Sequence, residues 1–150
     1  MEFGLSDEQR QLADALGGYL ANTVPMDTLR EISGHGTGFD AGLWQGLVEL
    51  GLPGLLVPEA HGGSGLGILD AAVAAETLGY GAAPAPFVAT MVMAPLALLH
   101  SGIDAQHAEW LPRIASGDVR IGVGFQGFGG TTGVTDLTLE NDRLSGRMDG

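Results

Sequence analysis

Two glycine-rich stretches contain the residue types that could hold a phosphate group or present a nucleophile. The first stretch is Gly62–Gly67, with the sequence GGSGLG. A Walker loop needs a Lys beside its last Gly, and the chain contains no Lys. A dinucleotide fingerprint would need Gly where Ile68 stands, and a nucleophile elbow centred on Ser64 would need Gly where Leu66 stands. We therefore interpret this stretch as a structural loop between helices.

The second glycine-rich stretch, Gly127–Gly133, follows a predicted strand, as the phosphate loop of a Rossmann fold would. Its last Gly comes one residue late, however, and the residues after it are β-branched rather than helix-forming. The dinucleotide motif is meaningful only in a strand–turn–helix context. These residues therefore do not predict a Rossmann site.

The four histidines do not have the spacing of a metal site. None belongs to an H-E-x-x-H motif, and the chain has no Cys that could join them as a ligand. His100 and His107 lie at the two ends of a predicted helix–loop–helix turn, where we expect a capping or solvent-facing role. Trp44 and Trp110 lie on apolar helical stripes, which favours the core over ligand stacking. No metal ligand is predicted.

Composition restricts the possible partners and location. Eighteen acidic residues against six Arg give a net charge of −12, which argues against binding nucleic acid or an anionic membrane surface. The N-terminus lacks the basic start and apolar core of a signal peptide. The longest apolar run, Phe87–Leu99, is too short to span a bilayer and contains Pro95. We expect a cytoplasmic protein without disulfides or membrane insertion.

Apolar residues at helical spacing predict a helical region from residue 1 to residue 117. The cap at Ser6 with Gln9 three residues later starts the first helix, and Asp40 caps another that ends at Gly51. Further helices are expected at Met26–Ile32, Ile68–Tyr80, Phe87–His100 and Asp104–Ser116. Asp104 should cap the last of these, whose expected inner face consists of Ala108, Leu111, Ile114 and Ala115. The segment Phe87–Leu99 has no polar face, so it should be the most buried, with a kink or break at Pro95. For Pro112, inside the last helix, the sequence offers no explanation.

The pattern changes at Val119, where helical spacing gives way to short strands. We expect one strand in Val119–Phe125, one within Gly133–Glu140 and one after a tight turn at Asn141-Asp142. Three such strands do not close a sheet well. Residues 118–150 are therefore interpreted as the beginning of a β domain that is incomplete here.

Four segments of the chain resemble acyl-CoA dehydrogenases, in the right order and spacing: LSDEQRQLADAL, LWQGLVELGLPGLLVPEAHGGSGLG, AAETLG and WLPRIASGDVRIGVGF. The resemblance implies a mainly α fold, in which an N-terminal helical bundle is followed by the first strands of a β middle domain. It further implies FAD as cofactor and an acyl-CoA substrate oxidised to the trans-2-enoyl-CoA. An electron-transfer partner for the flavin and a homo- or hetero-oligomeric assembly are implied in the same way.

The resemblance also assigns the candidate site residues. The flavin-contacting Thr-Glu-Pro-x-x-Gly-Ser-Asp stretch of the family falls on Phe125–Thr132, where Gly130 matches and Thr131 stands in for the Ser. Gly130 and Thr131 are thus the expected cofactor-binding residues. The catalytic base of the family lies in a C-terminal domain that the chain does not reach. No catalytic residue is assigned, and the chain alone is predicted to be inactive.

Three interpretations remain open at this point. The chain is the N-terminal portion of a FAD-dependent acyl-CoA dehydrogenase, or it is the same portion of a non-catalytic partner subunit with a degraded flavin site. If the resemblance is set aside, it is a helical interaction domain with no enzymatic context. The reduced set of side-chain donors in Gly127–Thr132 separates the first two interpretations only weakly.

Overall fold

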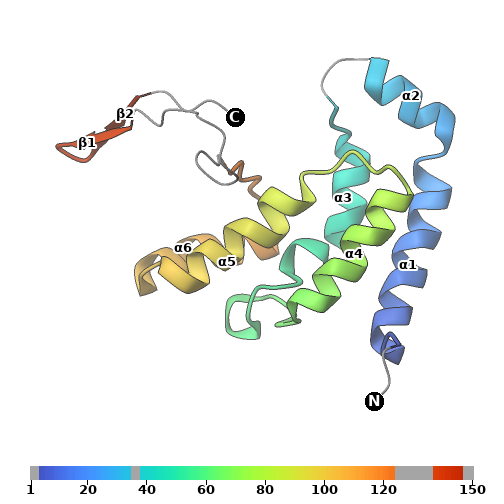
Figure 1. Ribbon diagram of the computed structural model, residues 1–150, viewed down its shortest axis with the longest axis horizontal. Coiled ribbons are helices and arrows are strands. Elements are labelled where there is room, and N and C mark those ends of the chain that lie inside the picture. Colours follow the sequence, from blue (N-terminus) through green and yellow to red (C-terminus); the bar gives the residue numbers. More distant parts are fainter. Residues whose placement is uncertain (1–3, 35–37, 124–136, 147–150) are drawn as a thin grey trace.

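The computed structural model describes residues 4–34, 38–123 and 137–146, and these form a helical body and a short hairpin (Figure 1). The predicted mainly α architecture is confirmed. The helices and strands are α1 (Asp7–Thr23), α2 (Met26–Gly34), α3 (Ala41–Glu49), the 3₁₀-helices η1 (Leu52–Gly54) and η2 (Glu59–His61), α4 (Ile68–Tyr80), the π-helix η3 (Phe87–Met93), α5 (Ala94–Ser101), α6 (Asp104–Ala115), β1 (Thr138–Glu140) and β2 (Arg143–Ser145).

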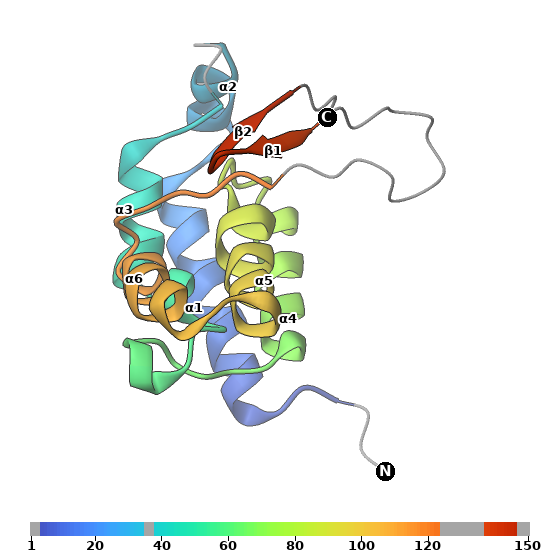
Figure 2. The same cartoon turned by 90° about the vertical axis from the view of Figure 1, so that its left-hand side faces the viewer.

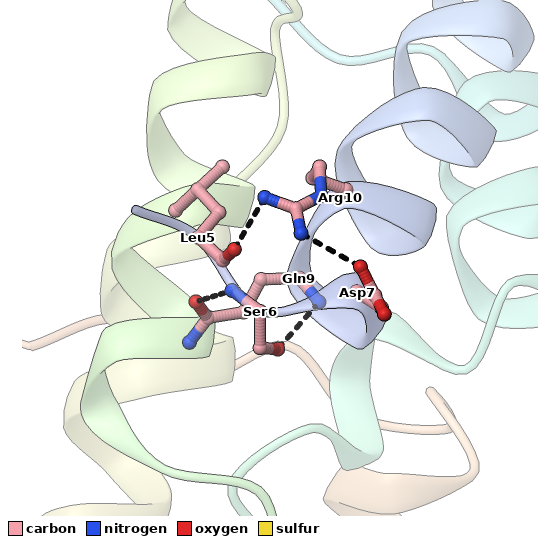
Figure 3. Close-up of polar contacts among 5 residues, drawn as sticks. All are labelled: Leu5, Ser6, Asp7, Gln9 and Arg10. Carbon is pink, nitrogen blue, oxygen red and sulfur yellow. Dashed lines mark hydrogen bonds and ion pairs between the residues drawn. The ribbon is translucent and has the colours of Figure 1, made fainter. Parts of the chain in front are cut away.

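Helix α1 begins at the predicted capping box (Figure 3). The Ser6 hydroxyl accepts a hydrogen bond from the Gln9 N–H at 3.2 Å, and the Gln9 side chain accepts one from the Ser6 N–H at 3.1 Å. Asp7 and Glu8 place negative charge in the first turn, where the helix dipole favours it. A backbone hydrogen bond and the Ser6 side chain lower the pKa of Glu8 below its ordinary value.

Helices α1 and α4 lie side by side and run in the same direction (Figures 1 and 2). Their N-termini are joined, because the Gln9 amide donates to Asp70 Oδ1 at 3.0 Å while Asp70 Oδ2 accepts from the Gly67 N–H at 2.8 Å. Farther along, small residues of α4 meet the apolar stripe of α1. Ala71 and Ala74 are buried in the same core cluster as Leu16 and Leu20.

The connection between α3 and α4 is built from close backbone contacts, as the structural interpretation of Gly62–Gly67 predicted. The Ser64 N–H donates to the Gly54 carbonyl and the Gly65 N–H to the Val57 carbonyl, both at 2.9 Å. A Cβ on Gly63 would lie 2.0 Å from the Val57 carbonyl oxygen, so only glycine fits there. Gly62 adopts a φ of 83°, which also favours glycine.

The apolar segment Phe87–Leu99 follows its prediction in part. It divides into η3 and α5 near Pro95, as expected of a residue that lacks an N–H. It is not buried on every side, however: Thr90 and Met91 are 0% exposed, whereas Val88 is 57% exposed. The lack of a polar stripe in the sequence indicates only that the helix is apolar on several sides. It does not show that the described residues cover all of them.

Helix α6 also corrects two predictions. Its N-cap is Ile103 rather than Asp104, and the Ile103 N–H is satisfied by Gln106 Oε1 at 3.1 Å. Ala108, predicted on the inner face, is exposed, while Leu111 and Ile114 are fully buried. Figure 2 shows α5 and α6 side by side, and a second core cluster joins them through Ala94, Leu111 and Ile114. Pro112 lies inside the helix at an exposed position.

Two of the three predicted strands are present. β1 and β2 pair antiparallel with Glu140 opposite Arg143, and Asn141 and Asp142 both have positive φ, as a two-residue hairpin turn requires. The strand predicted for Val119–Phe125 is wrong for residues 119–123, which are not in a sheet, and residues 124 and 125 lie outside the described part. The Ile121 backbone pairs with the Thr90 side chain instead of with another strand. The domain boundary at residue 117 stays a prediction.

Among the described residues, no helix combines the length and apolar character needed to cross a membrane.

Candidate functional site

A groove of about 600 Å³ lies where three separate segments of the helical body meet. We call it the junction groove. It is formed by the residues before α3, by the connector from α4 to η3 with the first turn of η3, and by the segment after α6. Its lining residues are Gly38, Phe39, Ala83, Pro84, Ala85, Pro86, Ala89, Thr90, Arg120, Ile121 and Gly122.

The connector wall of the groove follows from its sequence. Ala82 has a φ of 48°, and its N–H donates to the Gly79 carbonyl, so the chain turns sharply at the end of α4. Pro84 and Pro86 then keep the connector out of a helix. Pro86 precedes η3, where its missing N–H costs no helical hydrogen bond, and its carbonyl accepts from the Thr90 N–H at 3.0 Å. The result is a short, apolar wall.

One side chain of η3 makes two hydrogen bonds to the wall after α6. The Thr90 hydroxyl donates to the Ile121 carbonyl and accepts from the Ile121 N–H, both at 3.0 Å. Thr90 is 0% exposed and is the only buried polar or charged side chain among the described residues. On the Thr90 side both hydrogen bonds are shielded from solvent, and an unpaired hydroxyl there would be costly.

Arg120 provides the positive charge of the groove. Its guanidinium carbon lies 4.2 Å from the centre of the Phe39 ring and 5.9 Å from that of Trp44. Trp44 in turn donates from Nε1 to the Gly117 carbonyl at 3.2 Å. Within the described parts of the chain, Arg120 forms no ion pair with a carboxylate. A cation beside apolar surface suits a ligand that has both an apolar and an anionic part.

A second groove, of about 530 Å³, lies between α5 and α6. We call it the α5–α6 groove. Trp110 lines it and is half-buried rather than in the core, with the Arg113 guanidinium 4.8 Å from its ring centre. Ile121 lines both grooves. The two concave surfaces therefore share a residue of the segment after α6.

The described residues around the junction groove can bind a ligand but do not form an acid–base pair. Thr90 and Arg120 are its polar side chains, and neither is a carboxylate or an imidazole. The described residues also contain no group of three or more His, Asp or Glu that could hold a metal ion. Binding and positioning are the chemistry that this arrangement supports.

The predicted cofactor-binding residues, Gly130 and Thr131, lie outside the described residues, as does the whole of Gly127–Gly133.

The roles predicted for His100 and His107 agree with the structure. His107 Nε2 lies 2.8 Å from the Leu98 carbonyl at the end of α5, which is a capping contact, and His100 is exposed. His61 approaches His107 edge-on, with ring centres 6.4 Å apart.

Thr90 and Arg120 were not among the residues predicted from the sequence. A signal for Thr90 was present, because it is the only hydroxyl-bearing residue within the apolar run Phe87–Leu99. A polar residue in a stretch that is otherwise apolar needs a hydrogen-bonding partner. Its partner was not readable, since Ile121 is thirty-one positions away in the sequence.

Comparison with known proteins identifies relatives of this chain. The family model for the N-terminal domain of acyl-CoA dehydrogenases matches residues 6–118. The chain is 32% identical to acyl-CoA dehydrogenase IpdE2 of Mycolicibacterium smegmatis over 99 residues, which are 65% of this chain and 32% of the relative. It is 25% identical to acyl-CoA dehydrogenase FadE26 of Mycobacterium tuberculosis over 142 residues, 91% of this chain and 35% of the relative.

A solved structure has a similar fold. The ChsE4–ChsE5 complex of Mycobacterium tuberculosis matches with a TM-score of 0.77 and 27% identity, covering 91% of this chain and 41% of the matched chain. The chain spans about a third of the length of the curated relatives it matches.

Proposed function

The chain belongs to the acyl-CoA dehydrogenase family, and from this premise we propose that it is the N-terminal portion of a FAD-dependent dehydrogenase that oxidises an acyl-CoA thioester between its α and β carbons. The observation that carries the proposal is the junction groove, an apolar surface with one cation at the place where the helical body leads into residues 118–123. Eight positions after Gly122 comes Gly130, the residue that matches the flavin-contacting stretch of the family.

The size and lining of the groove support a role in holding the substrate. Its volume of about 600 Å³ falls within the range of small-molecule sites. Phe39, Ala85 and Ala89 offer apolar contact to an acyl chain, while Arg120 can attract an anionic group. In this proposal the helical portion binds and orients the acyl-CoA and excludes water from it.

The redox chemistry belongs to the cofactor. A bound flavin would accept the hydride from the β carbon, and Gly130 and Thr131 are the residues of this chain proposed to contact it. A carboxylate from a part of the longer protein beyond this chain would remove the α proton. Because neither group belongs to the described residues, the isolated chain is proposed to be inactive.

The assembly and the location of the longer protein are proposals as well. The longer protein is proposed to be a homo- or hetero-oligomer in the cytoplasm that passes electrons to a separate acceptor protein. The similar solved structure is a complex of two proteins, ChsE4 and ChsE5, which supports an assembly of more than one chain.

A second candidate function is that of a non-catalytic partner subunit. It is favoured by one specific observation: across Phe125–Thr132 only Gly130 matches the flavin-contacting stretch, with Thr131 as a conservative replacement. Phe128 also introduces a bulky side chain at this point. A subunit with such a loop would contribute structure and substrate surface while an unlike subunit held the flavin.

Flavin content separates the two functions. The longer protein is purified together with any chain that co-purifies, and FAD is measured per chain from its absorption spectrum. One tightly bound FAD per copy of this chain would exclude the partner-subunit function. If the flavin accompanies only an unlike chain, and restoring Thr and Glu at Phe125 and Gln126 adds none, the catalytic assignment of this subunit is wrong.

The substrate role of the junction groove has its own test. Ala89→Phe would fill the groove, so the longer protein should lose turnover of long acyl-CoAs while keeping that of short ones. Ala21→Phe, at an exposed position of α1, is the matched control and should leave the chain-length preference unchanged. Equal behaviour of the two variants would remove the groove from the substrate site.

A further inference from the structure

Thr90 is placed unusually for a residue whose role is only to fill space. It lies within the π-helix η3, and π-helical turns are rare and frequent at functional sites. Its neighbours Met91 and Phe87 are buried apolar residues, and a Val of similar shape would pack among them. The hydroxyl is therefore the feature of this side chain that requires an explanation.

The hydroxyl satisfies both backbone groups of one residue on another segment. Ile121 gives its N–H to Thr90 Oγ1 and receives the hydroxyl proton at its carbonyl, each at 3.0 Å. The segment 119–123 has no strand neighbour in the described part of the chain. In the described part of the chain, the backbone of this segment makes a long 3.4 Å hydrogen bond from the Val119 N–H to the Arg113 carbonyl. Its other hydrogen-bonding partner there is the Thr90 hydroxyl.

This pairing controls the shape of two grooves. Ile121 and Gly122 form a wall of the junction groove, and Ile121 also lines the α5–α6 groove. Apolar contacts alone are non-directional and would allow the segment to slide or rotate. A hydrogen-bonded pair on a single residue fixes both its position along η3 and the direction in which its side chain points.

We infer that Thr90 is a positioning residue of the proposed acyl-CoA site, which acts by holding Ile121 and thereby the wall of the junction groove. The inference rests on the proposed function for the identity of the ligand. The hydrogen-bonded clamp itself does not depend on it. Thr90 acts through Ile121 and makes no contact with the reacting atoms.

The first experiment tests the clamp in the 150-residue chain. Thr90→Val removes the hydroxyl and keeps the shape, Thr90→Ser keeps the hydroxyl, and amide hydrogen exchange is followed by NMR. Thr77→Val is the matched control, because the Thr77 hydroxyl donates only to the Val73 carbonyl within its own helix. The Ile121 amide should lose protection in Thr90→Val alone. Protection unchanged in that variant would overturn the inference.

The second experiment tests the positioning role in the longer protein, with its partner chain if one co-purifies. Turnover of straight-chain and branched acyl-CoAs is measured with an artificial electron acceptor. In Thr90→Val, KM should rise by roughly ten-fold, a factor that two lost hydrogen bonds of ordinary strength can produce, while kcat changes little. Thr90→Ser should restore the wild-type KM, and Thr77→Val should not change it.

The outcomes distinguish this inference from the proposed function. If the wild-type protein turns over acyl-CoA and Thr90→Val has the same KM as Thr77→Val, the positioning role is wrong and the proposed function stands. A fall in kcat at constant KM would also refute the role. If the wild-type protein oxidises no acyl-CoA, both ideas fail together. Should Thr90→Val not fold, Thr90→Ala carries the same expectations.

Discussion

Replacing Gly63 by Ala should be among the most damaging single-methyl additions to this chain. The added Cβ would lie 2.0 Å from the Val57 carbonyl oxygen and 2.6 Å from that of Gly54, and both neighbours are backbone atoms that no rotamer change can move. The loop would have to shift by about an ångström to reach van der Waals distance. The substitution therefore tests whether the connection between α3 and α4 is as tightly built as described.

The expected loss of stability follows from the hydrogen bonds that such a shift would break. The N–H groups of Gly63, Ser64 and Gly65 donate to the carbonyls of Pro58, Gly54 and Val57, at 3.2, 2.9 and 2.9 Å. At about 1 kcal/mol net for each bond, Gly63→Ala should lower the free energy of unfolding by about 3 kcal/mol. For a chain of this length, that corresponds to a fall in Tm of roughly 10 °C.

Substitutions at two other glycines serve as controls, because the direction of their effect on stability is known. Gly62→Ala meets no atom within 4 Å but would hold Ala at a φ of 83°, which should cost about 1 kcal/mol. Gly18→Ala, on the exposed side of α1 with nothing within 4 Å, should instead stabilise by up to about 1 kcal/mol. Thermal and urea unfolding of the three variants gives the order. A Gly63→Ala chain that unfolds like Gly62→Ala would refute the reasoning.

Two further predictions concern the joined N-termini of α1 and α4. Asp70→Ala should destabilise by about 1–2 kcal/mol, because it removes the acceptor for both Gln9 and Gly67, whereas Asp14→Ala at an exposed mid-helix position should be nearly neutral in urea unfolding. Equal effects of the two variants would argue against the link. The lowered pKa of Glu8 means that its carboxylate favours the folded state above the ordinary value of 4.5, and that this contribution is lost as the pH falls through the lowered pKa. The wild-type chain should therefore have a higher Tm than Glu8→Gln at pH 6, and the difference in Tm should vanish at low pH. A difference in Tm that does not change with pH would show that it does not come from the Glu8 charge.

The parts of the fold that the sequence predicted well are those set by local interactions. Ile68–Tyr80 is helical over the predicted range, and the box at Ser6 and the cap at Asp40 form as expected. In each case the group that satisfies the exposed N–H lies within three residues. Such interactions are complete in a short window of sequence, so the window contains the information needed to predict them.

The failed predictions depend on residues that are distant in the sequence. Whether residues 119–123 form a strand depends on whether another strand lies beside them, and their composition does not contain that information. The exposure of Val88 depends in the same way on what packs against η3. The junction groove was missed for this reason: Phe39, Ala85 and Arg120 come from three segments, and no spacing in the sequence relates them.

The buried hydroxyl of Thr90 connects the local interactions with the distant ones. Apolar burial brings the segment after α6 against η3, but side chains such as Ile121 and Val119 would be buried about equally well if the segment moved along the helix. Thr90 removes this freedom, because only one residue at a time can offer its N–H and carbonyl to the same hydroxyl. A shift by one position would break both hydrogen bonds in a partly buried place, at a cost of about 1 kcal/mol each. The Thr at position 90 thus selects one arrangement among several that hydrophobic packing alone would allow, and that arrangement gives the junction groove its wall.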